Sequence, residues 1–137
     1  NDDETSAFEK LPEMSVEEIG KICRLTMLKL LPALAEHDIK NFGEALTAIQ
    51  ETIGAHFAQV QGGMFRADSA DCIEFIKEIG ACGVGQSSWG PTLYGVLKQE
   101  EAKEALIKVK AYIAKGAEGQ VFIAKANNKG ANIKLVS

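Results

Sequence analysis

The chain has 137 residues, of which 46% are hydrophobic and 25% charged, as in an ordinary soluble globular domain. No apolar run reaches the roughly 20 residues that a membrane-spanning helix needs, and a net charge of −4 argues against general nucleic-acid binding. We therefore expect one soluble domain with neither a membrane nor a nucleic-acid partner.

Acidic residues concentrate at the start of the chain. Seven of them and a single lysine lie between Asn1 and Glu18, whereas the remainder is nearly neutral. We interpret residues 1–14 as an acidic lead-in or linker and residues 15–137 as the domain. The sequence starts at Asn1 with no initiator Met and no signal-peptide pattern, so we expect a piece of a longer protein.

Two amphipathic helices are predicted first. Ser15 and Glu18 have the spacing of a capping box, and Pro32 should kink or end the first helix near Leu31. Asp38 is a second candidate N-cap. The apolar residues of each helix recur every three or four positions, which predicts one buried face per helix. These faces comprise Val16, Ile19, Ile22, Cys23, Met27, Leu30 and Leu34, and then Ile39, Phe42, Leu46, Ile49, Ile53, Phe57 and Val60.

Mixed structure should follow the helix stop at Gly62. We expect a short helix capped by Ser69 or Asp68 and closed by Gly80, then an extended stretch over 81–87 and a turn at Gly90-Pro91. The remaining predictions are a strand at 92–97, a helix at 99–115, the clearest strand at 120–124, a turn at 127–130 and a last strand at 133–136. This order indicates an α+β two-layer sandwich, an antiparallel sheet covered on one face by helices.

The candidate for chemistry is the glycine-rich loop from Gly83 to Thr92. Glycines permit close backbone approach, successive N–H groups can bind an anion, and the only tryptophan could stack on a flat ligand. The alternative is a tight turn between two strands, with Trp89 packed over a helix. The candidate phosphate-binding residues are Gly85, Gln86, Ser87, Ser88, Trp89, Gly90 and Thr92, with Asn128 and Lys129 as further candidates.

Histidines and cysteines give weaker signals. His37 is interpreted as a cation at a helix end, and His56 should face partly outward, neither having a partner for catalysis. The three cysteines, Cys23, Cys72 and Cys82, lack metal-ligand spacing and are an odd number. We expect small core thiols in a reducing cytoplasm and no metal ligands among them.

The segment 85–95, Gly-Gln-Ser-Ser-Trp-Gly-Pro-Thr-Leu-Tyr-Gly, resembles the C-terminal glycine motif of the archaeal β-ribofuranosylaminobenzene 5'-phosphate synthase family. This family belongs to the GHMP kinase superfamily, whose kinases carry a TGAGxGG-like loop at this place. Similar stretches extend the resemblance from about Val16 to Ala131. They include residues 30–34, 42–46, 61–63 and 121–131.

The resemblance implies a ferredoxin-like fold and an enzyme that joins 4-hydroxybenzoate or 4-aminobenzoate to phosphoribosyl pyrophosphate. Carbon dioxide and pyrophosphate leave, and the product enters methanopterin biosynthesis. It further implies a homodimer that uses Mg²⁺ without ATP, and an active site shared with an N-terminal domain that this sequence lacks. The chain alone should then be inactive.

Within that family, the loop backbone from Gly85 to Ser88 and the hydroxyls of Ser87, Ser88 and Thr92 would hold phosphate. Trp89 would pack against the aromatic substrate or the domain interface, with Asn128 and Lys129 at the same rim. No general base is evident. Two alternatives stay open: the C-terminal domain of an ATP-dependent small-molecule kinase of the same superfamily, and a non-catalytic ligand-sensing ferredoxin-like domain.

Overall fold

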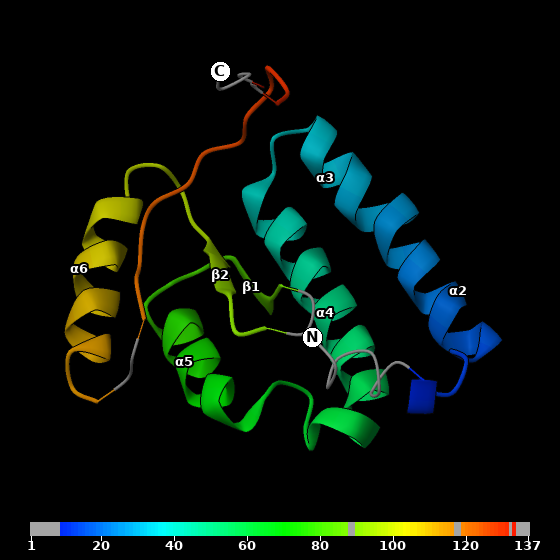
Figure 1. Ribbon diagram of the computed structural model, residues 1–137. Helices are drawn as coiled ribbons and strands as arrows, with labels where there is room; N and C mark the ends of the chain where they lie inside the picture. The colour runs from blue at the N-terminus through cyan, green and yellow to red at the C-terminus, as the bar shows by residue number, and fades with distance from the viewer. Residues whose placement is uncertain (1–8, 88–89, 117–118, 132, 134–137) are drawn as a thin grey trace.

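The computed structural model describes residues 9–87, 90–116, 119–131 and 133. Along the described chain, helices come first, then a β-hairpin and a further helix, as Figure 1 shows. The elements are α2 (Val16–Leu25), the π-helix η1 (Thr26–Leu30), α3 (Leu31–Ala35), α4 (Ile39–Gln61), α5 (Ala67–Glu78), β1 (Gly83–Gln86), β2 (Leu93–Val96) and α6 (Ala102–Ile113).

The capping box at the start of α2 is confirmed. The Ser15 hydroxyl accepts a hydrogen bond from the Glu18 N–H at 3.2 Å, and the Glu18 carboxylate accepts one from the Ser15 N–H at 2.8 Å.

Helical structure continues past the break expected at Pro32, through η1 and α3. Because Pro32 lacks an N–H, the ordinary hydrogen-bond pattern cannot pass through it. The wider π-turn of η1, in which the Leu31 N–H donates to the Thr26 carbonyl, lies directly before the proline.

A tight junction reverses the chain between α3 and α4. The Asp38 N–H donates to the Ala33 carbonyl at 2.8 Å and the His37 N–H to the Leu34 carbonyl at 3.3 Å, which is the Schellman pattern. His37 therefore has a positive φ of 58° at a position that usually holds glycine. The Asp38 carboxylate caps α4 by accepting from the Asn41 N–H at 3.0 Å, as predicted.

Helix α4 is the central element, with α2, η1 and α3 along one side and the hairpin along another (Figure 1). It meets β1 backbone to backbone, because a Cβ on Gly43 would lie only 2.6 Å from the Gly83 nitrogen. The Thr47 hydroxyl accepts from the Val84 N–H at 3.0 Å and lies 3.5 Å from the Val84 carbonyl. Gly62, with a φ of 83°, ends the helix as expected.

The core joins α5 to the hairpin. Ile73, Ile76 and Val84 are buried together, and Phe65, Leu93 and Val109 pack against them. Helix α5 begins earlier than expected, with Arg66 as N-cap, so the prediction of Ser69 or Asp68 as its cap was wrong. Ser69 is buried within the first turn. Gly80, with a φ of 101°, closes the helix as predicted.

The predicted hairpin is confirmed. Strands β1 and β2 are antiparallel, with Gly83 opposite Val96 and Gln86 opposite Leu93. Helix α6 also occurs where it was expected, though shorter, and Ala105 is its buried residue. The described residues thus form a mixed α+β structure with a small two-stranded sheet. None of their helices is long and apolar enough to cross a membrane.

The predicted strand at 120–124 is wrong. Residues 121–124 are irregular, with Phe122 77% and Ile123 44% exposed. A strand exists only by pairing, and high β-propensity does not form one without a partner. Of the last predicted strand, Ile133 is irregular and exposed, and residues 134–136 lie outside the described residues.

The predicted buried face of the first helix is also wrong in part. Val16 is 87%, Met27 62% and Leu34 55% exposed, while Ile22 and Leu30 are half-buried.

Cys23 is exposed rather than in the core, and Cys72 and Cys82 are half-buried. His56, expected to face partly outward, is buried at 5% exposure. The errors at the first helix and at His56 concern which side of a helix faces its neighbour, and tertiary packing decides that side.

Candidate functional site: the loop between the two strands

The loop that joins β1 to β2 is built around a tight turn. The Ser87 N–H donates to the Thr92 carbonyl at 2.8 Å, and the Gly90 N–H donates to the Ser87 carbonyl at 2.9 Å. Gly90 has a φ of 81°, which favours glycine there, and a cis bond joins it to Pro91. The Gly90 N–H is thus used inside the turn. Ser88 and Trp89 lie outside the described residues.

Gly85, in β1 just before the loop, packs closely against the side chains of Tyr94 and Gln50. A Cβ at this position would overlap the Tyr94 ring and hydroxyl and lie 2.7 Å from Cγ of Gln50, on α4. Burial raises the pKa of the Tyr94 hydroxyl. The close approach at Gly85 is therefore to side chains of the same chain, and a ligand would meet the loop further along.

Gln86 and Arg66 tie this loop to the start of α5. Gln86 is only 6% exposed, and its side-chain oxygen accepts from the Arg66 N–H at 3.2 Å. The Arg66 side chain also lies against the loop, because a Cβ on Gly90 would come 3.0 Å from its Cδ. The residues 85–92 contain no charged side chain. Arg66 therefore brings a permanent positive charge to the loop, beside the positive end of the α5 dipole.

Sequence reasoning missed Arg66, Gln50 and Tyr94 as members of this site. The one sequence signal for Arg66 is that it is the first basic residue after the Gly62-Gly63 helix stop, and its place as N-cap is known only from where α5 begins. Nothing in the sequence indicates that a residue 20 positions away binds Gln86.

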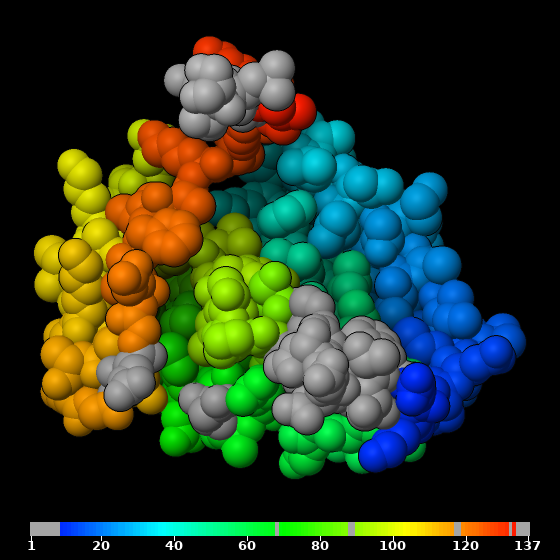
Figure 2. Space-filling view, viewed as in Figure 1, coloured from blue at the N-terminus to red at the C-terminus, as the bar shows by residue number. Residues whose placement is uncertain are grey.

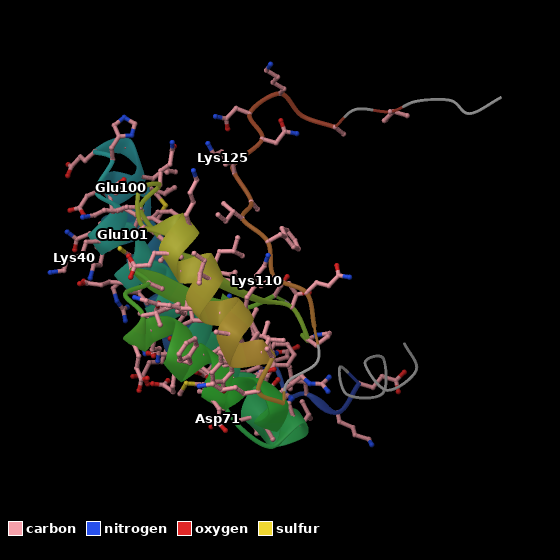
Figure 3. All side chains as sticks on the ribbon, turned by 90° about the vertical axis from the view of Figure 1, so that its left-hand side faces the viewer. Lys40, Asp71, Glu100, Glu101, Lys110 and Lys125 are labelled. Carbon is pink, nitrogen blue, oxygen red and sulfur yellow. The ribbon has the colours of Figure 1, made fainter. Side chains whose placement is uncertain are left out.

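Asn128 and Lys129 are not brought to this loop. They are exposed in the predicted turn, where the Asn127 side chain accepts from the Lys129 N–H at 3.0 Å and donates to the Gly130 carbonyl at 2.8 Å. Figure 1 draws this turn, in orange-red, at the top of the molecule, well away from the loop between β1 and β2. In Figure 3, Lys125 of the same segment lies far from Asp71 in α5.

The chemistry of the loop suits an anion. The exposed hydroxyls of Ser87 and Thr92, with Arg66 beside the turn, can donate hydrogen bonds to phosphate oxygens. Figure 2 shows the segment 90–93, in yellow-green, on the surface facing the viewer. Mg²⁺ prefers carboxylate oxygens, and residues 85–92 contain no carboxylate. The described residues also bring together no group of three His, Cys, Asp or Glu that could hold a metal.

A separate hollow of roughly 280 Å³ lies between α4, α5 and the start of β1. The charged side chains that line it are Glu44, Glu51 and Lys77. Glu44 accepts from Lys29 at 2.7 Å, whereas Lys77 lies 2.8 Å from Glu74 and 3.8 Å from Glu51. Acidic side chains outnumber basic ones in this lining, so the hollow offers no excess positive charge to a phosphate and the loop stays the stronger candidate.

The comparisons identify the class of protein. Residues 30–115, well over half of the chain and spanning the loop, match the family model of the GHMP kinases C terminal domain. The chain therefore belongs to this family. No solved structure matches it.

The similarity to three curated relatives extends over most of the chain. It is 34% identical to the "Beta-ribofuranosylphenol 5'-phosphate synthase" of Archaeoglobus fulgidus, covering 96% of this chain and 40% of the relative. The proteins of the same name from Methanocaldococcus jannaschii and Methanothermobacter thermautotrophicus are 33% and 25% identical, over 95% and 93% of this chain. The chain thus spans about 40% of the length of the relatives it matches.

Proposed function

We propose that this chain is the C-terminal part of a synthase that forms a β-ribofuranosylphenol 5'-phosphate. The observation that carries the proposal is 33–34% identity, over almost the whole chain, to two synthases of that name. The reaction joins phosphoribosyl pyrophosphate to 4-hydroxybenzoate. The ring carbon bonds to the ribose, the carboxyl group leaves as carbon dioxide, and pyrophosphate leaves the sugar. A phenol in the relatives' name favours 4-hydroxybenzoate over 4-aminobenzoate.

The loop between β1 and β2 is the proposed phosphate site. Ser87 and Thr92 lie at its two ends, joined by the 2.8 Å hydrogen bond, and Arg66 contacts its turn. These groups are suited to hold a phosphate of the substrate by charge-assisted hydrogen bonds, which orients the sugar without supplying a base. We propose that Ser88 and Trp89 complete the site.

The wider assignment rests on the same resemblance. We propose a ferredoxin-like sandwich, assembled into a cytoplasmic homodimer that acts in archaeal methanopterin biosynthesis without ATP. An N-terminal domain would complete the active site, and the fragment would be inactive alone. Any Mg²⁺ ligands would come from that domain, because the loop here supplies none.

A direct assay tests this function. The full-length protein is incubated with phosphoribosyl pyrophosphate and carboxyl-labelled 4-hydroxybenzoate, and labelled carbon dioxide and pyrophosphate are measured. We expect both products in equal amounts. Release of neither would reject the proposal, and Ser87→Ala is expected to raise KM for phosphoribosyl pyrophosphate.

A GHMP small-molecule kinase is the second candidate, because the matched family is named for kinases. Calorimetry on the full-length protein separates the two. A synthase binds phosphoribosyl pyrophosphate and not ATP, whereas a kinase binds ATP. Binding without turnover of either compound would favour the ligand-sensing domain.

A further inference from the structure

The outer side of the first helical run is apolar and uncovered. Val16 is 87%, Ile19 47%, Met27 62%, Leu31 43% and Leu34 55% exposed, and Cys23 is exposed among them. These six residues recur every three or four positions along α2, η1 and α3, so they line one side of the run. We call this side the outer face.

The opposite side of the same run is already used. Ile22, Leu25, Leu30 and Ala33 are half-buried or buried, and the run packs along α4. Figure 1 shows α2 and α3 as the outermost elements beside α4. A helix that is apolar on both sides is normally buried on both sides. A continuous exposed apolar patch of this kind marks an interaction surface.

We propose that the outer face docks an apolar surface of the polypeptide that precedes this chain in the full-length protein. The proposal rests on the proposed function, because it takes this chain as the C-terminal part of a longer synthase. The relatives are about two and a half times as long, since the chain covers 40% of the first. Residues 30–115 match a C-terminal family, so most of the additional length precedes this chain.

The position of the face agrees with that partner. Its first residue, Val16, is the first residue of α2, so the chain enters this helical run at one end of the face. Charged residues border it, with Glu17, Lys21 and Arg24 exposed on the same helix. An apolar centre with a charged rim is the composition of a protein interface.

Cys23 is a built-in probe of this face. In the folded full-length protein, its labelling by a maleimide is measured by peptide mapping and compared with that of Lys21→Cys on the same helix. Lys21 is exposed but lies on the charged side. We expect Cys23 to react about tenfold or more slowly than the cysteine at 21, because access governs thiol labelling. In denaturant the two rates should converge.

Equal rates for the two cysteines in the folded protein would overturn the proposal. Protection that disappears on dilution, together with a shift from dimer to monomer in sedimentation, would assign the face to a second copy and also overturn it. A photo-crosslinking residue in place of Met27 identifies the partner. Crosslinks within one polypeptide, to residues that precede this chain, are the expected result.

The synthase assay on the same preparation separates this inference from the proposed function. Activity with a freely reactive Cys23 rejects the docking proposal alone. Protection of Cys23 without synthase activity rejects the proposed reaction and retains the docking surface.

Discussion

Gly43→Ala tests the backbone contact between α4 and β1. In an isolated helix this change would stabilise by about 1 kcal/mol. Here the added Cβ would overlap the Cys82 carbonyl and lie 2.6 Å from the Gly83 nitrogen. Since ordinary contacts begin at about 3.5 Å, α4 and β1 must separate by about 1 Å.

The expected cost follows from that displacement. Overpacking costs about 1–3 kcal/mol, and the upper value applies because both partners are backbone and cannot rotate away. Subtracting the gain in helix propensity leaves a net destabilisation of about 2 kcal/mol. The strand that moves continues into the loop, so Ser87 and Gln86 should shift with it.

Gly20→Ala is the matched control. A Cβ there meets only the end of the flexible Arg24 side chain, at 3.3 Å. We expect this variant to gain up to about 1 kcal/mol. Urea unfolding followed by circular dichroism measures both. A Gly43→Ala variant as stable as the unchanged protein would refute the close approach of α4 to β1.

Three further predictions concern the capping box of α2, the junction between α3 and α4, and the loop between β1 and β2. Ser15→Ala should cost about 1 kcal/mol at neutral pH. The Ser15 hydrogen bonds lower the pKa of the Glu18 carboxyl below its ordinary 4.5, so the part of the stabilisation that comes from the ionised carboxylate is lost as the pH falls through the lowered pKa, whereas the bond from the Glu18 N–H to the Ser15 hydroxyl remains; urea midpoints that differ equally at pH ~7 and ~3 would contradict it. His37→Gly should stabilise by about 1 kcal/mol because φ is 58°, and a lower melting temperature would count against the Schellman geometry. Arg66→Gln keeps the backbone bond to Gln86 but should raise KM for phosphoribosyl pyrophosphate about tenfold to a hundredfold, whereas an unchanged KM would remove Arg66 from the site.

The helix limits were largely predictable because caps are local. Ser15 and Asp38 each accept from the N–H group three residues on, and Gly62 and Gly80 end their helices through their own φ angles. The start of α5 is the exception. Ser69 has the chemistry of a cap, but its burial in the first turn depends on packing.

What depends on distant partners was not predictable. Residues 120–124 have strand composition, yet a strand requires hydrogen bonds from another segment. The first helix carries apolar residues on two sides, and periodicity alone does not say which side meets α4. At the loop, the sequence indicated the glycines and hydroxyls, whereas the contribution of Arg66 depends on where α5 begins.

The hydrogen bond between Thr47 and Val84 has a consequence for the growth of the sheet. A strand is extended sideways through the backbone groups on its free edge, and those of Val84 are already bonded to a side chain of α4. No further strand can add at that position of β1. A strand that joins this hairpin, whether from residues 121–124 or from another domain, must therefore add beside β2, so the sheet has one direction of enlargement.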